Sequence, residues 1–246
     1  MIPVDEALNR IFALCSPLEV ETVPLAMAAG RVLAEPVRAR RDQPPFAGSA
    51  MDGYAVKGPV AVGQVFRVVG EAGAGHAYAG QLAAGEALRI FTGAPMPEGT
   101  DHVVIQEDVI RDGDAITLRA DLGAGTNVRP AGGDFRAGDV LSAPRRLRPV
   151  DLGLLAAMNL AEVPVYRRPS VALIATGDEL VMPGEDPGPD QIIASNSFGL
   201  AAMLEQHGAE ARMLPIARDN AASLQLALKL CAGADLIVTI GGASVG

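Results

Sequence analysis

Residues 169–240 alternate between apolar, strand-like runs and helical patterns, and this alternation restricts the fold more than any other feature of the chain. The run Ser170–Thr176 is continuously apolar and contains β-branched residues, which is typical of a strand buried on both faces. Two helical segments and two further strand-like runs follow it: Ser195–His207, Asn220–Cys231, Ala211–Ile216 and Asp235–Ile240. This order predicts a parallel βαβαβ unit, which binds ligands beyond the carboxyl ends of its strands.

The N-terminal segment is predicted to be mainly helical. Apolar residues recur every three to four positions over Val4–Cys15, which indicates an amphipathic helix. A second helix is expected over Ala26–Ala34, broken at Gly30, and a third over Pro149–Leu160. Short strands are expected at Val20–Leu25 and Glu162–Tyr166.

The region from Gln43 to Pro144 has no sustained helical period. Short apolar runs bounded by Gly and Pro predict an all-β module, and they lie at Gly63–Val69, Ala87–Phe91, His102–Gln106, Ala115–Leu118 and Asn127–Arg129. The small residues of Pro44–Ala55 predict a fixed loop around Asp52 rather than a strand.

These patterns predict a multidomain chain of the α+β and α/β classes. We expect a discontinuous helical domain at residues 1–42 and 145–168, an inserted β domain at 43–144, and an α/β domain at 169–246. The chain stops directly after the third strand-like run of the α/β pattern. We therefore expect that last domain to be incomplete and the chain to be C-terminally truncated.

Charge and composition exclude several classes of protein. The 29 acidic and 20 basic residues give a net charge of −9, and there is no Trp, which argues against nucleic-acid binding. No apolar stretch reaches the roughly 18 residues of a membrane helix. Asp5 and Glu6 occupy the place of a basic signal-peptide start, so we expect a cytoplasmic protein. Cys15 and Cys231 suggest neither a disulfide framework nor a metal cluster.

Carboxylates in predicted loops are the strongest candidates for a functional site: Asp52, Asp134, Asp178, Glu179 and Asp219. Clustered acids of this kind suit a hard cation such as Mg²⁺, which can bridge an anionic substrate to an acidic protein. Solvated loop charge and helix capping explain Asp178 and Glu179 equally well, and Asp219 and Asn220 also fit an ordinary N-cap. The glycines of residues 241–246 indicate either a phosphate cradle of backbone N–H groups or a plain tight turn.

Other chemistries have less support. His76, His102 and His207 lie in unrelated contexts, so neither a zinc site nor a Ser-His-Asp triad is indicated. The Gly-rich loops match neither the dinucleotide fingerprint nor the Walker A pattern.

Six segments, taken together, resemble one known family. They are SAMDGYAV at Ser49–Val56, FTGAPMPEG at Phe91–Gly99, VVIQED at Val103–Asp108, the GD-x-x-x-G at Gly133–Gly138, AEVPVYRRPSVALIATGDEL at Ala161–Leu180 and GGASVG at 241–246. In this order and spacing the chain resembles the molybdenum insertases of molybdenum-cofactor synthesis, the MoeA type that also forms the E domain of gephyrin. The resemblance extends over essentially the whole chain.

The resemblance implies a four-domain protein: a helical domain interrupted by a β domain, a molybdopterin-binding α/β domain, and a C-terminal β-barrel domain absent from these 246 residues. It also implies a reaction in which molybdenum from molybdate is inserted into adenylylated molybdopterin with release of AMP, with Mg²⁺ as the divalent cation. Family members act as homodimers, with the site between the α/β domain of one subunit and the β domain of the other. Contact with the molybdopterin adenylyltransferase or with molybdoenzymes is a further implication.

The family's catalytic residues correspond to Asp52, Thr92, Asp134, Asp178, Glu179 and Asp219. Glu179 and Asp219 are the implied metal ligands, with Asp178 beside them, whereas Asp52, Thr92 and Asp134 would bind molybdate, the cation or the attacking water. The implied substrate-binding residues are Ser49, Thr176, Gly177, Ser195, Asn196, Gly241, Gly242, Ser244 and Gly246.

Three positions depart from the family pattern and reduce the number of expected metal ligands. Gly133 stands where Glu is frequent, Asn220 stands where a second Asp is frequent, and residues 193–196 lack a common acid. One alternative is therefore a non-catalytic molybdopterin-binding or scaffold module of the same fold. An unrelated metal-dependent phosphohydrolase would leave the motifs of the β region unexplained. We expect little or no turnover from the 246-residue chain alone.

Overall fold

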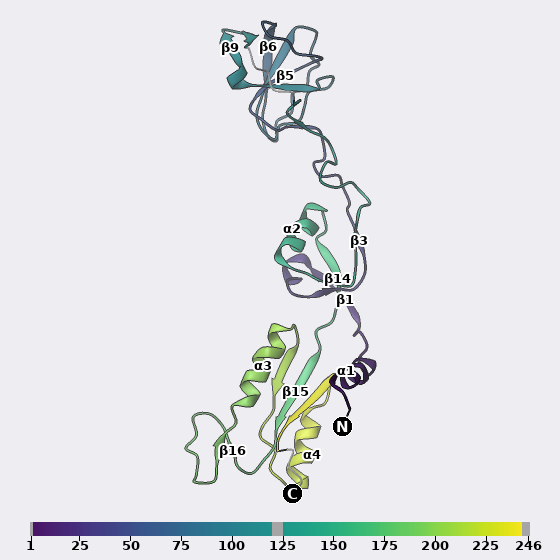
Figure 1. Ribbon diagram of the computed structural model, residues 1–246, viewed down its shortest axis with the longest axis vertical. Coiled ribbons are helices and arrows are strands. Elements are labelled where there is room, and N and C mark those ends of the chain that lie inside the picture. The colour runs from purple at the N-terminus through teal and green to yellow at the C-terminus, as the bar shows by residue number, and fades with distance from the viewer. Residues whose placement is uncertain (1, 120–124, 243–246) are drawn as a thin grey trace. The chain divides into compact units, whose positions relative to one another are not determined.

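The computed structural model describes residues 2–119 and 125–242. Its helices and strands give the mixed α and β content expected from the sequence (Figure 1). Packing divides the chain into two compact units. Unit 1 comprises Met1–Glu35, Ala143–Leu152 and Glu162–Gly246, and unit 2 comprises Pro36–Ser142 and Gly153–Ala161. None of the helices in the described part of the chain has the length and apolar character needed to cross a membrane.

Unit 2 is built on a six-stranded sheet with the order β8-β5-β7-β6-β10-β9. Its strands are β5 (Gly53–Val56), β6 (Val65–Ala72), β7 (Glu86–Ile90), β8 (His102–Ile105), β9 (Val109–Asp112) and β10 (Ala115–Leu118). All neighbouring strands run antiparallel except β6 and β7, which run parallel. The strands predicted between residues 63 and 118 are confirmed, whereas β9 was not predicted.

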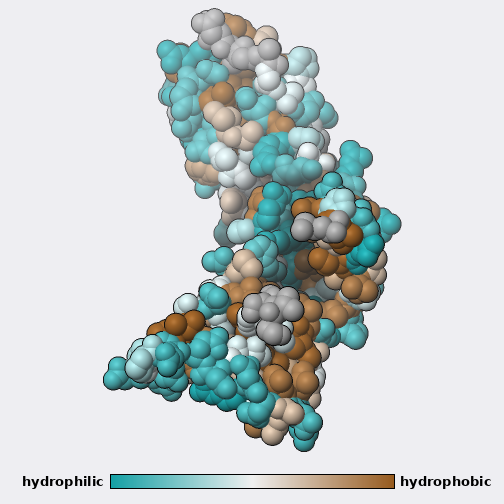
Figure 2. Space-filling model, turned by 60° about the horizontal axis from the view of Figure 1, so that its bottom comes forward, coloured by the Kyte–Doolittle hydropathy of each residue, from teal (hydrophilic) through white to brown (hydrophobic). Residues whose placement is uncertain are grey.

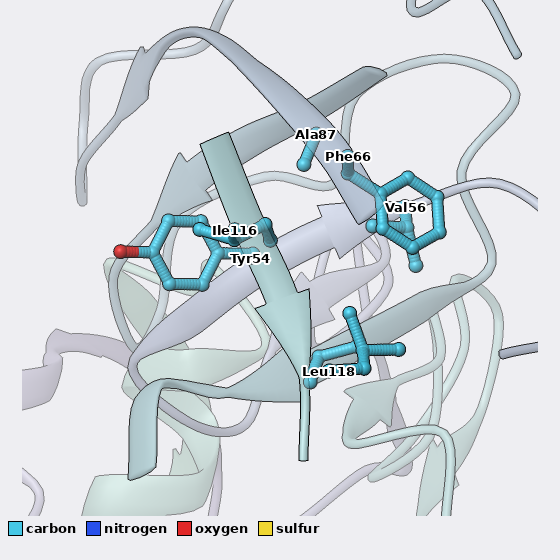
Figure 3. Packing of buried hydrophobic residues seen from close by; sticks show 7 residues of the cluster. Tyr54, Val56, Phe66, Ala87, Ile116 and Leu118 are labelled. Atoms are coloured by element: carbon cyan, nitrogen blue, oxygen red, sulfur yellow. The ribbon is translucent and has the colours of Figure 1, made fainter. Parts of the chain in front are cut away.

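Strand β5 corrects one prediction, because it occupies part of the segment expected to be a loop. Its four residues are all buried, and alternate side chains enter different hydrophobic clusters. Figure 3 shows Tyr54 and Val56 in one of them, with Phe66, Ala87, Ile116 and Leu118. The small residues that suggested a loop instead allow close packing. A Cβ at Gly53 would lie 2.0 Å from the Val104 carbonyl oxygen of β8.

Short strand pairs complete the β structure of unit 2. Strand β4 (Gly48–Ser49) pairs with β11 (Val128–Arg129), and β3 (Val37–Arg38) pairs with β12 (Val140–Leu141). A 3-10 turn, η2 (Gln106–Asp108), follows β8.

Unit 1 contains a parallel sheet of the order β18-β15-β19. Its elements follow one another as β15 (Ser170–Ala175), α3 (Asn196–Gln206), β18 (Glu210–Met213), α4 (Ala221–Leu230) and β19 (Leu236–Ile240). Ala201 of α3 packs with Val171 and Leu173, whereas Ala227 of α4 packs with Ala172 and Ile174. The two helices therefore cover opposite faces of β15. A small parallel pair, β16 (Leu180–Val181) and β17 (Ile192–Ile193), lies between β15 and α3 in the sequence.

A second sheet of unit 1 lies in the segments assigned to the predicted helical domain, and it confirms the strands predicted at Val20–Leu25 and Glu162–Tyr166. It has the order β1-β14-β2-β13, with β1 (Val20–Pro24), β2 (Val32–Leu33), β13 (Arg145–Arg146) and β14 (Glu162–Tyr166). The helix predicted over 26–34 is wrong, because this stretch forms the 3-10 turn η1 (Leu25–Met27) and β2. Gly30 has φ +74°, a turn conformation, and the apolar pair after it joins the sheet instead.

The remaining helices are α1 (Val4–Ala13) and α2 (Pro149–Ala157), both at predicted places. Helix α1 contains no buried residue, so its apolar side chains, such as Ile11 and Phe12, are exposed. Leu226 and Leu228 of α4 and Leu236 of β19 are more than half exposed. Hydrophobic surface is visible in the lower part of Figure 2, the end that carries α3 and α4 in Figure 1.

Candidate functional site

Three distant segments of unit 2 meet at the short strand β4. The backbone N–H of Ser49 donates to the Ala94 carbonyl at 3.0 Å, and the N–H of Gly93 donates to the Ser49 carbonyl at 2.9 Å. On the other side, β4 pairs with β11, and the N–H of Ala50 donates to the Asn127 carbonyl at 2.9 Å. The segments around Asp52, Thr92 and Arg129 are thus brought together from distant parts of the sequence.

Asp52 and Thr92 form a direct hydrogen-bonded pair. The Asp52 Oδ1 atom accepts the backbone N–H of Thr92 at 2.8 Å and its hydroxyl at 2.7 Å. The sheet explains this placement: β5 begins directly after Asp52, β7 ends two residues before Thr92, and Gly53 lies opposite Ile90 in the antiparallel register. The two side chains therefore leave the same end of the β5–β7 pair.

The hydrogen bonds from Thr92 hold the pKa of the Asp52 carboxyl below its usual range, first through the backbone N–H and then through the hydroxyl. The nearby charge of Arg89 lowers this pKa further, whereas partial burial opposes both effects. Asp52 is therefore a carboxylate at neutral pH. The single O–H of Thr92 donates to Asp52. The Thr92 hydroxyl oxygen can therefore only accept hydrogen bonds from other groups.

Asp134 has a different partner from Asp52. Its two carboxylate oxygens accept from the Arg129 guanidinium at 3.0 and 3.1 Å, and both side chains are about half exposed. Within the described residues, no hydrogen bond joins Asp134 to Asp52 or Thr92.

Ser49, an implied substrate-binding residue, is only 1% exposed. Its hydroxyl donates to the Met51 carbonyl at 2.5 Å. The hydroxyl therefore holds the turn that leads into Asp52.

In unit 1, the implied site residues lie where the parallel strands end. The N–H of Thr176 donates to the Ile240 carbonyl at the end of β19, and the N–H of Gly177 donates to the Ala217 carbonyl in the segment after β18. The exits of all three strands therefore meet at one edge. There, the backbone N–H of Asp219 donates to Asp178 Oδ1 at 3.2 Å, so the structure brings these two acids together.

Arg218 was not predicted as a functional residue, yet its side chain forms hydrogen bonds that hold the backbone at this edge. Its NH1 atom donates to the carbonyl oxygens of Gly177 at 3.3 Å, Asp178 at 3.0 Å and Leu180 at 3.0 Å. The sequence offered one sign of this role, since Arg218 is the only basic residue adjacent to any of the five candidate loop carboxylates.

Two glycines at the strand exits lie directly against neighbouring side chains. Gly177 has φ +144°, and a Cβ there would lie 2.1 Å from Glu179 Oε2, so the Glu179 carboxylate folds back over this residue. A Cβ at Gly241 would lie 2.2 Å from the Thr176 Oγ1 atom. At Gly242, by contrast, a Cβ would meet nothing within 4 Å.

The N-terminal ends of α3 and α4 show which of the nearby polar residues act as helix caps. Asn220 caps α4, because its side-chain oxygen accepts the N–H of Ser223 at 2.9 Å. Ser195 is in the N-cap position of α3 but makes no side-chain capping bond, and Asn196 is the first helical residue. Neither residue therefore caps α3 through its side chain. Ser244 and Gly246 lie outside the described residues.

The acids of the described residues are also candidate cation ligands. Across residues 2–119 and 125–242, no group of three or more His, Cys, Asp or Glu side chains is arranged to hold a metal ion. Mg²⁺, however, commonly uses only one or two protein carboxylates and takes its remaining ligands from water and substrate phosphates. The adjacent exposed acids at the ends of β15 and β18 fit that limited requirement.

Comparison with known proteins covers nearly the whole chain. A family model described as the MoeA N-terminal region (domain I and II) matches residues 2–159, and one described as a probable molybdopterin binding domain matches residues 172–246. Proteins named molybdopterin molybdenumtransferase from Nostoc sp. and Haemophilus influenzae are 38% and 37% identical over 100% of this chain. The chain spans 59% and 62% of their respective lengths.

A solved structure gives the same relationship. The molybdopterin biosynthesis MoeA protein from Pyrococcus horikoshii OT3 matches with a TM-score of 0.88 and 30% identity. The match covers 97% of this chain and 66% of that protein. On the family model that spans residues 2–159, and on these similarities over 97–100% of the chain, it belongs to the MoeA family.

Proposed function

We propose that this protein acts in molybdenum cofactor synthesis as a molybdopterin molybdenumtransferase, which inserts molybdenum from molybdate into adenylylated molybdopterin and releases AMP. The convergence of three distant loops at β4, which pairs Asp52 with Thr92, is the observation that carries this proposal. The names of the relatives support the same activity. The proposal includes the family's inserted β domain at 43–144, its molybdopterin-binding α/β domain at 169–246, and a cytoplasmic homodimer.

The Asp52–Thr92 pair is suited to orient a water molecule. The hydroxyl proton of Thr92 is directed to Asp52, so Thr92 Oγ1 and Asp52 Oδ2 offer acceptors to an incoming group. A water molecule can donate to these atoms, and the carboxylate can take up its proton as the water oxygen attacks a phosphorus of the phosphoanhydride, the bridging P–O bond breaks and AMP is released. Molybdate offers only acceptors at neutral pH, so its oxygens need a donor such as the Arg129 guanidinium.

At the other group of acids, Glu179 and Asp219 would hold Mg²⁺, with Asp178 beside them. The cation would neutralise developing charge on phosphate oxygens during cleavage of the phosphoanhydride. Arg218 fixes the backbone that carries Asp178, and the unobstructed backbone at Gly242 would let an N–H group approach a phosphate. Thr176 would contact the substrate from the same edge.

The test is AMP release from adenylylated molybdopterin on addition of molybdate and Mg²⁺ to the complete polypeptide. We expect release that depends on both additions and is lost in Asp52→Ala and in Asp178→Ala. Full activity in these two variants would contradict the assigned roles. Binding of molybdopterin without AMP release would instead identify a binding or scaffold module.

A further inference from the structure

We propose that Arg89 is the positioning residue of the Asp52–Thr92 pair, because its guanidinium contacts the residue next to each member, Gly53 after Asp52 and Phe91 before Thr92. The catalytic part of this inference, an effect of Arg89 on the reaction, rests on the proposed function. Its structural part stands on contacts within unit 2.

Arg89 lies on β7, directly opposite Tyr54 of β5 in the antiparallel register. From this position its NH1 atom donates to the Gly53 carbonyl at 3.2 Å. Gly53 follows Asp52 directly, so this bond anchors the C-terminal side of the Asp52 turn.

The guanidinium also lies close to two aromatic rings. Its central carbon is 5.1 Å from the centre of the Tyr54 ring and 4.7 Å from that of the Phe91 ring. Both distances are within the range of a cation–π contact. Phe91 directly precedes Thr92, so the same group contacts the strand leading from Asp52 and the turn leading to Thr92.

A third contact closes a ring of interactions. Arg89 NH2 donates to Gln106 Oε1 at 2.5 Å, and the backbone N–H of Gln106 donates to the Asp52 carbonyl at 3.0 Å. Arg89 therefore reaches two consecutive backbone carbonyls, that of Gly53 directly and that of Asp52 through Gln106. A planar guanidinium can donate to the Gly53 carbonyl and to Gln106 Oε1 while it lies against the two rings, whereas an ammonium group cannot make all of these contacts.

These contacts predict that loss of Arg89 lets the two turns separate and lengthens the bonds from Thr92 to Asp52. The Thr92 amide proton reports this directly, because its chemical shift depends on the bond to the carboxylate. We would record ¹H–¹⁵N spectra of Arg89→Met, Arg89→Lys and Asp52→Asn, with Arg67→Met as control. Arg67 is an exposed arginine of the same sheet, paired with Glu86.

We expect Arg89→Met to move the Thr92 amide signal toward its position in Asp52→Asn, and Arg89→Lys to move it less. In the AMP-release assay, kcat should fall about 10-fold to 100-fold in Arg89→Met with little change in KM, since misplacement of a reacting group has effects of this size. Arg89→Lys should recover part of the loss, and Arg67→Met should match the unmodified protein in both measurements.

An unchanged Thr92 signal in folded Arg89→Met would overturn the proposal. If that variant does not fold, Gln106→Met decides, because the Gln106 side chain is exposed and its loss should produce a smaller shift in the same direction. No shift there would equally overturn the proposal. Absence of AMP release in the unmodified protein, with the expected spectral shifts, would refute the proposed function and leave the positioning role of Arg89 intact.

Discussion

Asp52 in unit 2 accepts two hydrogen bonds of 2.7 and 2.8 Å on one carboxylate oxygen, whereas Asp178 in unit 1 accepts a single backbone N–H at 3.2 Å. The first carboxylate is held by a hydroxyl, an amide and a neighbouring arginine, and its pKa is lowered. The second carboxylate is exposed and lies where the parallel strands end. There, Arg218 holds the backbone by hydrogen bonds to carbonyl oxygens, including that of Asp178. The comparison indicates that unit 2 presents a preorganised pair, whereas the exposed unit 1 carboxylates are less constrained, as the cation site that we propose there requires.

Removal of the Asp52 carboxylate should have the largest effect. We expect Asp52→Ala to reduce kcat for AMP release by about 100-fold or more, the scale of a lost general base. Asp101→Asn is a matched control, because Asp101 also accepts one backbone N–H, that of Gly58 at 2.9 Å, away from the paired residues. Equal losses in the two variants would show that the preorganised pair has no special role.

Arg218→Met should weaken the unit 1 site while leaving the Asp52–Thr92 pair unaltered. The three carbonyls that Arg218 holds would be released, and we expect Mg²⁺ affinity to fall about 10-fold, as for other residues that orient ligands. Titration of Mg²⁺ in the AMP-release assay measures this change. Arg10→Met, on the exposed surface of α1, should have no effect. An unchanged Mg²⁺ requirement in Arg218→Met would show that Arg218 does not support the cation site.

Gly241→Ala tests how tightly the strand exits are packed. The new Cβ would meet Thr176 Oγ1 at 2.2 Å, so we expect a loss of about 1–3 kcal/mol in the free energy of unfolding, as for other overpacked sites. Urea unfolding measures it, with Gly242→Ala as the unhindered control. Because Thr176→Ala removes the obstructing oxygen, the double variant should regain most of the loss. Equal stability of the two single glycine variants would refute the close contact.

The smallest expected effect on stability is a change in its pH dependence in Thr92→Val. This substitution removes the hydroxyl bond that lowers the pKa of Asp52, so the folded-state pKa rises toward its ordinary value. A lowered pKa adds stability above the unfolded-state pKa of about 4, and this stability is lost as the pH falls through the folded-state value. The acid midpoint of unfolding should therefore move to higher pH in Thr92→Val and remain in place in Thr92→Ser. A midpoint that does not move would mean that the hydroxyl contributes little.

The periodicity of the sequence was sufficient to predict the parallel strands, α3, α4 and most strands of unit 2. It failed where residues serve tertiary contacts: Gly53 and Ala55 suggested a loop, but their small size lets an interior strand pack closely on β8. The helix predicted over 26–34 failed because Gly30 turns the chain and Val32 and Leu33 pair with distant strands.

The site could be predicted only in part, for a related reason. Motifs identified Asp52 and Thr92 one at a time, but their hydrogen bonds depend on the β5–β7 register, which local sequence does not determine. Arg89 and Arg218 carry little local signal, since their roles are defined by carbonyl groups and rings brought close by folding.

The position of Asp52 immediately before β5 also bears on how this part of the molecule moves. Strand β5 is hydrogen-bonded on both edges and buried on both faces, so it is not able to detach as an isolated segment. Amide protons of Tyr54 and Ala55 should consequently exchange with solvent only when the whole sheet opens. Asp52 and Thr92 would then separate only when the cooperative structure of unit 2 opens.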